Sequence, residues 1–162
     1  MKKLLCLLTL CFVLTACGGQ APADTPAPLD VTAEGCAQTI LENGTFSETL
    51  ETVDPAVAAA LYGVDESLLL DCAAYLSTGA TAEECVFLLF AEEADALDAC
   101  QGFQLRLEEQ TDALRDYQPG ELPKLDDASH GTLPVTNGVL AYLVVSGEKL
   151  DVPTLLTSSY NG

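Results

Sequence analysis

Basic residues are scarce in this chain, and their scarcity excludes nucleic acid as a partner. The sequence has 6 Lys and Arg against 25 Asp and Glu, which gives a formal net charge of −19. Nucleic-acid binding needs clusters of Lys and Arg that displace counterions from phosphates. An acidic surface of this kind attracts cations or basic partners, and it also keeps a protein soluble by self-repulsion.

The sequence also has little that resembles a catalytic signature. His130 is the single histidine, and the neighbouring Ser129 falls on the same expected strand, where adjacent side chains point to opposite faces. A G-x-S-x-G elbow, a phosphate-binding loop and an H-E-x-x-H pair are absent, and no C-x-x-C pair favours zinc. We therefore expect no catalytic residue, cofactor or metal. A hydrolase that uses acidic residues is the alternative, because paired carboxylates leave no local sequence signature.

Apolar runs long enough to span a bilayer are absent as well. The N-terminal run, Leu4 to Leu14, follows Lys2 and Lys3 and has the length of a secretory signal rather than of a membrane helix. It ends in "LTAC", which resembles the lipobox of bacterial lipoproteins, whose cysteine receives a diacylglyceryl group. We predict a lipoprotein signal peptide over residues 1–16 and lipidation at Cys17. The alternative is a plain secretory signal with an incidental Cys17.

Lipidation would anchor the chain to the extracytoplasmic face of the cell membrane through acyl chains such as palmitate. Two or more chains hold a protein stably, since each buried methylene contributes ~0.8 kcal/mol. Removal of Lys2 and Lys3 with the signal takes the net charge from −19 to −21. Residues 17–30 then form the lipidated Cys and a Gly-, Ala- and Pro-rich linker, and residues 18–29 at ~3.1 Å per residue hold the domain roughly 30–40 Å from the bilayer.

Residues 31–162 have the size of a single domain. Four cysteines fall in it, and each lies among apolar residues: Cys36, Cys72, Cys85 and Cys100. Four cysteines in an exported domain allow two disulfides in three connectivities. Buried free thiols behave as small hydrophobes, and we favour this second interpretation.

Two short helices are predicted near the start of the domain. Thr32 can cap a helix that runs to about Asn43 and ends at Gly44. The segment 54–63, "DPAVAAALYG", begins with a capping Asp and a first-turn Pro and ends with Gly, which is typical of a short helix.

Strands are predicted in the middle of the chain. Residues 68–77 alternate between apolar and polar side chains, although a helix ending at Gly79 also fits their spacing. Residues 85–91, "CVFLLFA", form a continuous apolar run, which favours a strand buried on both faces. The alternative is one helix from Ala82 onward, begun by a capping box of Thr81 and Glu84.

A long helix is predicted from about Ala94 to Tyr117, before Pro119. One face of it has residues spaced by three or four, namely Leu97, Cys100, Phe103, Leu107, Thr111 and Leu114. Gly102 within this helix costs up to ~1 kcal/mol relative to Ala.

The last third of the domain is predicted to contain a hairpin. Asn137–Gly138 between apolar runs is a strong turn signal, and Pro134 places the first strand at a sheet edge. The segment "LDVPTLLTSSY" adds a last short helix. We expect an α+β fold, in which an antiparallel sheet of about four strands packs against the long helix and short N-terminal helices.

The order of several short motifs resembles a known family. After the lipobox come "LYGVD", "GATAEECVFL", "ALDACQGFQLRLEEQ", "DYQPGE" and "NGVLAYLVVS". This order is similar to that of small Gram-positive, clostridial-type lipoproteins with the domain of unknown function numbered 4358. The family has no established activity, so the resemblance implies no catalytic residue. It implies only that Glu84, Arg106, Tyr117 and Pro119 fall at recurring motif positions, while "DACQGFQ" is less charged than the family pattern.

Arg106 is one of only four basic residues after the signal, so we expect it to have a partner. The first interpretation is a structural ion pair with Glu84 or another nearby acid, and the alternative is an arginine that binds a carboxylate or phosphate ligand. Together these features favour a membrane-anchored, non-catalytic binding or interaction module whose partner is a cell-envelope protein or peptide.

Overall fold

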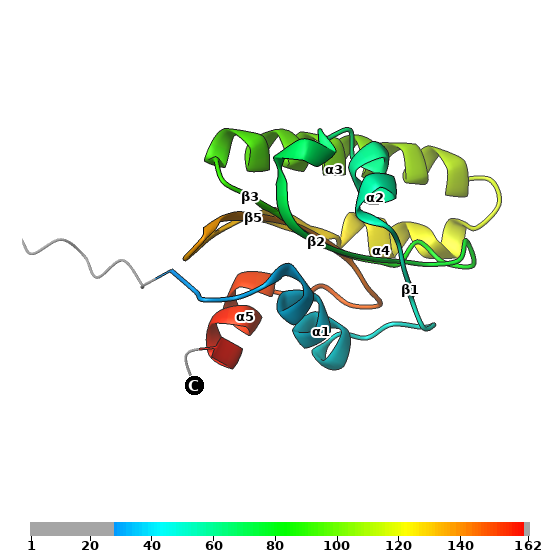
Figure 1. The fold of residues 1–162 in the computed structure, drawn as a ribbon. Coiled ribbons are helices and arrows are strands. Elements are labelled where there is room, and N and C mark those ends of the chain that lie inside the picture. The colour runs from blue at the N-terminus through cyan, green and yellow to red at the C-terminus, as the bar shows by residue number, and fades with distance from the viewer. Residues whose placement is uncertain (1–27, 161–162) are drawn as a thin grey trace, which may run out of the picture.

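The domain is a five-stranded antiparallel sheet with helices packed on both faces (Figure 1). The structure is a computed structural model that describes residues 28–160. The predicted α+β class is confirmed. The signal peptide, Cys17 and most of the predicted linker lie outside the described residues. In chain order the elements are α1 (Ala33–Asn43), β1 (Glu51–Thr52), α2 (Pro55–Leu61), η1 (Glu66–Leu68), β2 (Leu69–Leu76), β3 (Glu84–Phe90), α3 (Glu93–Leu114), η2 (Pro119–Glu121), α4 (Leu122–Asp126), β4 (Ser129–Val135), β5 (Gly138–Val145) and α5 (Val152–Tyr160).

The strand order is β1-β2-β3-β5-β4, which places β3 at the centre of the sheet. Every residue of β3 is buried, so the prediction of a strand buried on both faces is confirmed and the long-helix alternative is wrong. The strand prediction for 68–77 is also confirmed, as β2. The sheet has one strand more than expected, the two-residue β1, which pairs with the end of β2.

Two apolar cores lie on the two faces of the sheet. The first is between the sheet and helices α1 and α5, and includes Cys36, Ile40, Phe87 and Leu156. The second is between the sheet and helices α2 and α3 and includes Phe103. Because helices cover both faces, the central strand has no polar side to show to solvent, and this explains the unbroken apolar run in the sequence.

The helix starts follow the predicted capping chemistry. The Thr32 hydroxyl accepts the Gly35 N–H at 3.0 Å at the start of α1, and the Asp54 carboxylate accepts the Ala56 N–H at 2.9 Å at the start of α2. Upstream of α1 the packed region already begins at Leu29, which is buried and bridges to Val135 of β4. The domain thus starts two residues before residue 31.

The predicted face of α3 is largely confirmed, since Phe103 is buried and Cys100, Leu107 and Leu114 pack against the second core, but Leu97 is not part of it. Leu97 is 49% exposed, and the buried residues are Ala96, Ala99 and Phe103. Ala96 and Ala99 belong to the core between the sheet and α3, while Gly102 allows α3 to approach the residue that follows α2, since a Cβ there would lie 1.9 Å from the Tyr62 carbonyl oxygen. The small side chains at the start of α3 therefore face the core, and Leu97 lies on the exposed side of the helix.

The hairpin between β4 and β5 is present, but its turn lies one residue earlier than predicted. Val135 pairs with Gly138, so the turn residues are Thr136 and Asn137. Among the described residues only glycines have positive φ, and Gly138 itself has φ 150°. A Cβ at Gly138 would lie 2.0 Å from the Phe90 carbonyl oxygen. The glycine is therefore required by a close backbone approach after the turn. Pro134 lies in β4, an edge strand, as predicted.

Candidate functional site

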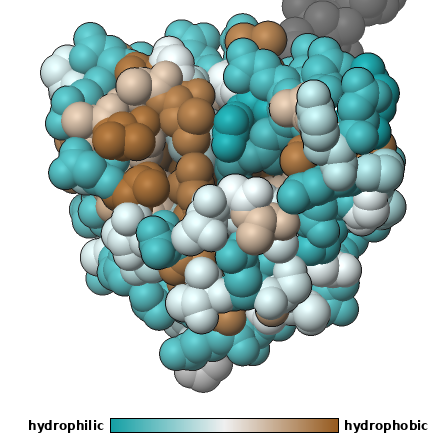
Figure 2. Space-filling model, turned by 90° about the vertical axis from the view of Figure 1, so that its right-hand side faces the viewer, coloured by the Kyte–Doolittle hydropathy of each residue, from teal (hydrophilic) through white to brown (hydrophobic). Residues whose placement is uncertain are grey.

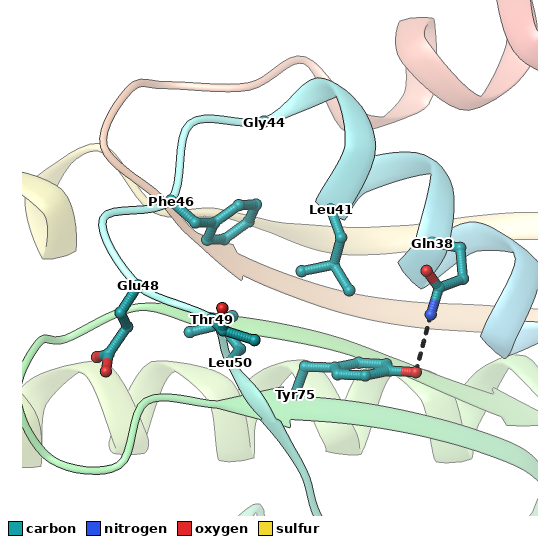
Figure 3. Close-up of a pocket in the computed structure, with 8 residues that line it drawn as sticks. All are labelled: Gln38, Leu41, Gly44, Phe46, Glu48, Thr49, Leu50 and Tyr75. Atoms are coloured by element: carbon teal, nitrogen blue, oxygen red, sulfur yellow. Dashed lines mark hydrogen bonds between the residues drawn. The ribbon is translucent and has the colours of Figure 1, made fainter.

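A pocket of about 450 Å³ lies between α1, the segment 44–50 and strand β2 (Figure 3). Its volume falls in the range of small-ligand sites, roughly 300–1,000 Å³. The sequence offers no local signal for it, since its residues come from three separate segments. The lining consists of Gln38, Leu41, Gly44, Phe46, Glu48, Thr49, Leu50 and Tyr75.

The walls of the pocket are apolar and partly aromatic. Phe46, Leu41 and Tyr75 face one another across it in Figure 3. All three are partly buried side chains that pack against the α1 core. Gly44 allows the chain to leave α1 at this point, because a Cβ there would lie 2.9 Å from the Ile40 carbonyl oxygen and 2.8 Å from the Phe46 ring. Any residue can adopt its φ of −86°, so the glycine is explained by the lack of space for a side chain.

One end of the pocket has a fixed hydrogen-bond network. The Tyr75 hydroxyl donates to Glu34 Oε1 at 2.6 Å and accepts from Gln38 Nε2 at 3.0 Å. Gln38 Nε2 also donates to Glu34 Oε1 at 2.9 Å. Burial, together with the adjacent Glu34 carboxylate, raises the pKa of Tyr75, so its hydroxyl keeps its proton. This network holds the Tyr75 ring in place at the base of the pocket.

Glu48 forms the opposite end of the pocket. Its Oε1 accepts hydrogen bonds from the Ser77 hydroxyl at 2.5 Å and from the Thr81 hydroxyl at 2.8 Å. These hydrogen bonds lower the pKa of Glu48, so it is ionised at neutral pH. None of the eight lining residues is basic. The lining therefore carries one carboxylate, that of Glu48, and no cation, while Glu34 contacts the Tyr75 hydroxyl from outside the lining.

The segment 44–50 is held by a buried carboxylate. Both oxygens of Glu83 accept the Ser47 N–H, at 3.0 and 2.9 Å, and Oε1 also accepts the Ser47 hydroxyl at 2.7 Å. Lys124 Nζ lies 2.9 Å from Glu83 Oε1 and 3.0 Å from Glu121 Oε2. Burial alone would raise the pKa of Glu83, but the hydrogen bonds from Lys124 and Ser47 lower it. A charged pair thus fixes one wall of the pocket.

Lys124 Nζ is also 3.2 Å from the Ser47 hydroxyl, a spacing that resembles a serine–lysine pair. A lysine that activates serine must be neutral, with a lowered pKa. Burial acts in that direction on Lys124, but its contacts with Glu83 and Glu121 outweigh it and raise the pKa. Lys124 is therefore protonated and cannot act as a base for Ser47.

Glu84 and Arg106, the predicted ion pair, are brought together on the other face of the sheet. Arg106 Nη2 and Nε lie 2.7 and 3.0 Å from Glu84 Oε1, which also accepts from Gln110, while Tyr62 donates to Oε2 at 3.0 Å. Burial raises the pKa of Glu84, although Arg106 opposes the rise. The pair joins β3 to α3 and lines none of the pockets described here.

The four cysteines of the domain carry free thiols in the structure. Cys36 and Cys85 are buried, while Cys72 and Cys100 are half-buried. Burial raises the pKa of Cys36 to about 12 and that of Cys72 to about 11, and it raises the pKa of the other two thiols as well. Since the thiolate is the reactive form, none of the four is activated as a nucleophile.

The remaining residues singled out in the sequence do not gather at the pocket. Ser129 and His130 are neighbours on β4 and therefore point to opposite faces of the sheet. Tyr117 is 87% exposed after α3, and Pro119 begins η2. Within residues 28–160, no group of three or more metal-ligating side chains comes together, and no helix has the length and hydropathy to cross a membrane.

The side of the molecule shown in Figure 2 is largely hydrophilic, with one larger hydrophobic patch and several smaller ones. Comparison with models of protein families, with curated proteins and with solved structures finds no match for this chain.

Proposed function

We propose that the protein is a lipid-anchored, non-catalytic binding module on the extracytoplasmic face of the cell membrane. The location rests on the signal-like residues 1–16, on Cys17 in "LTAC" and on the Pro-rich linker. We also propose that it belongs with the lipoproteins carrying the domain of unknown function numbered 4358, on the strength of the motif order. Its partner is then a cell-envelope protein or peptide.

The observation that carries the binding function is the pocket between α1, the segment 44–50 and β2. Its walls are apolar and aromatic, and its polar groups are fixed in advance by Glu34, Gln38 and the Ser47–Glu83 contacts. Apolar walls with a few positioned polar groups are typical of ligand sites. A preformed site also binds with less loss of conformational entropy than a mobile one.

The hydrolase alternative has less support. A glycosidase-like hydrolase needs a pair of carboxylates that converge on one substrate. The two buried glutamates, Glu83 and Glu84, are sequence neighbours whose carboxylates contact different layers of the domain, and each is held by a cation. Neither lines the pocket, and Glu48 is the one carboxylate among the residues that do, so no second carboxylate converges with it on a ligand there.

A photo-crosslinking residue placed in the pocket tests the binding function. We would replace Thr49, which lines the pocket, in the full-length protein and irradiate cells that produce it. The matched control is the same residue at Glu109, an exposed position on α3, which packs on the opposite face of the sheet. We expect a discrete adduct from position 49 that is absent from position 109.

The adduct is also expected to weaken when Phe46→Ala removes one pocket wall in the same protein. An equal adduct from both positions would contradict the assignment of the pocket. So would the absence of any adduct from position 49.

A further inference from the structure

We infer that the pocket takes the side chain of a lysine presented by a protein or peptide partner. This inference rests on the proposed binding function and gives its ligand a chemical class. A lysine side chain combines an apolar four-carbon stem with a terminal ammonium group. The pocket offers a matching surface to each part.

The stem would lie against the apolar walls formed by Leu41, Phe46 and Leu50. Figure 3 places Leu41 and Phe46 on one side of the pocket and Leu50 and Tyr75 on the other. Each methylene removed from water contributes about 0.8 kcal/mol. An unbranched alkyl chain therefore gains affinity for these walls whether or not it ends in a charged group.

The ammonium group has aromatic and acidic partners in the same pocket. Phe46 and Tyr75 present ring faces, and a cation within about 6 Å of a ring centroid is attracted by the ring quadrupole. Glu48 lines the pocket and is held ionised by its hydroxyl donors, and Glu34 lies beside the pocket, against the Tyr75 hydroxyl. Both charges therefore favour a cationic ligand over an anionic one.

None of the four basic residues of the described domain lines the pocket, and Lys149 lines a separate pocket together with Ser129 and Asp151. Lys124 approaches Ser47 beside the pocket, but its charge is matched by Glu83 and Glu121. Arg106 is paired with Glu84 on the other face of the sheet, and Arg115 lies 2.9 Å from Asp112. The acidic field at the pocket is thus available to a ligand from outside the domain.

A partner side chain suits the pocket better than a free amine. Small ligands bind where a cavity encloses most of their surface. This pocket is open to solvent, so a free alkylamine would leave much of itself exposed. A lysine carried by a protein can make further contacts beside the pocket, where the exposed Glu51 of β1 follows the lining residue Leu50. The strongly acidic surface also speeds the encounter with a basic partner.

The test compares two peptides that differ only in the ammonium group. The first is acetyl-Gly-Gly-Lys-Gly-Gly-amide, and the second has norleucine, which has the same straight-chain stem without the charge. Each is titrated into the ¹⁵N-labelled mature chain while amide chemical shifts are followed. We expect the lysine peptide to shift residues 38–50 and Tyr75, with an affinity at least about threefold above that of norleucine.

The outcomes separate the two proposals. If norleucine shifts the same amides with equal or higher affinity, the lysine inference is wrong while the pocket stands as a binding site. If neither peptide shifts amides around the pocket, the lysine inference fails, and the crosslinking at position 49 decides whether the pocket binds any partner. If the lysine peptide shifts acidic segments all over the surface to the same degree, the attraction is general and the lysine inference is again wrong.

Two charge-matched variants sharpen the result. Glu48→Gln removes the carboxylate at one end of the pocket, and Glu109→Gln removes an equal charge from α3 on the other side of the sheet. We expect Glu48→Gln to weaken the lysine peptide by about twofold to fivefold, the size of an exposed charge pair, and to leave norleucine unchanged. Equal weakening by both variants would overturn the assignment.

Discussion

Two adjacent carboxylates, Glu83 and Glu84, connect the start of the central strand to different layers of the domain. Glu83 holds Ser47 of the pocket segment and pairs with Lys124, while Glu84 pairs with Arg106 of α3. Both glutamates are almost completely buried. A buried charge is tolerated only when it is paired and hydrogen-bonded, so each of these residues depends on its partner.

The first prediction concerns the ion pair on the α3 side. Arg106→Ala leaves the Glu84 carboxylate buried beside Tyr62 and Gln110 without a cation. We expect the free energy of unfolding to fall by about 3–5 kcal/mol, the cost of removing one partner from a buried pair. Urea denaturation followed by circular dichroism measures the change.

The matched control for this prediction is Arg115→Ala, in the last turn region after α3. Arg115 pairs with Asp112, but both side chains are more than half exposed, so the expected loss is below about 1 kcal/mol. Similar losses in the two variants would mean that the Glu84–Arg106 pair stabilises the fold no more than a surface pair.

The second prediction concerns the pH dependence of stability on the pocket side. The pKa of Glu83 is lowered in the folded state, so the unfolded chain takes up a proton first as the pH falls. Glu83 thus contributes stability above pH 4.5, and this contribution is lost as the pH falls from there toward its lowered value. We expect Glu83→Gln to have a shallower decline of unfolding free energy between about pH 5 and pH 3.

The other carboxylates also make the unfolding free energy depend on pH, because acid relieves their mutual repulsion. This effect is the same in the wild-type protein and in Glu83→Gln, so the difference between the two curves reports on Glu83. Unfolding in urea at a series of pH values provides the curves. Parallel curves for the two proteins would show that the Glu83 pKa does not change on folding.

At this scale the sequence predicted the Glu84–Arg106 pair, because a lone arginine on an amphipathic helix in an acidic chain needs a partner. The sequence could not predict the hydrogen-bonded cluster of Glu83, Lys124 and Ser47. Its members come from three segments far apart in the chain, and acidic residues are too numerous for any one to stand out. The pocket escaped prediction for the same reason.

At the scale of elements, the close approach of α3 to Tyr62, the residue that follows α2, depends on one glycine. A Cβ at Gly102 would lie 1.9 Å from the Tyr62 carbonyl oxygen, and backbone cannot move aside as a flexible side chain can. In an isolated helix Gly102→Ala would stabilise by about 1 kcal/mol. Here we expect the variant to destabilise the protein by about 1–3 kcal/mol, since overpacking outweighs helix propensity.

Thermal unfolding measures this prediction, with Gly120→Ala as the control. Gly120 has no neighbouring atom within 4 Å of an added Cβ, so its substitution should leave the midpoint almost unchanged. A Gly102→Ala protein that is more stable than the original would contradict the close approach of α3 to Tyr62.

Local signals predicted the elements well where the chemistry is local. Thr32 and Asp54 cap their helices because a side-chain oxygen two or three residues away from an N–H needs no tertiary contact. Local signals failed where contacts between residues far apart in the chain determine the structure. The turn lies at Thr136–Asn137, and Gly138 after it approaches the Phe90 carbonyl oxygen, a contact far along the chain. Leu97 is exposed because Ala96 and Ala99 are the residues of that turn of α3 that face the core.

At the scale of the whole molecule, the acidic charge and the proposed lipid anchor both bear on how the domain would be held at a membrane. The acidic surface disfavours contact with anionic lipids, so the domain has no electrostatic means of holding to a membrane. An acyl anchor at Cys17 and an extended linker would place the pocket away from the bilayer, where a basic partner can reach it. The proposed membrane location therefore rests on Cys17, which lies outside the described residues.

That dependence gives the last prediction. Cells that produce the protein are fed a palmitate analogue and then fractionated. We expect the wild-type protein to incorporate the label and to sediment with membranes. We expect Cys17→Ala to lose both properties, because the remaining chain offers an N-terminal apolar run of only Leu4 to Leu14 and a repelled acidic domain. Cys72→Ser, which changes a half-buried cysteine of the domain, should keep the label. Label that persists in Cys17→Ala would place the acyl chain on another residue, and an unlabelled wild-type protein would mean that the signal is an ordinary secretory one.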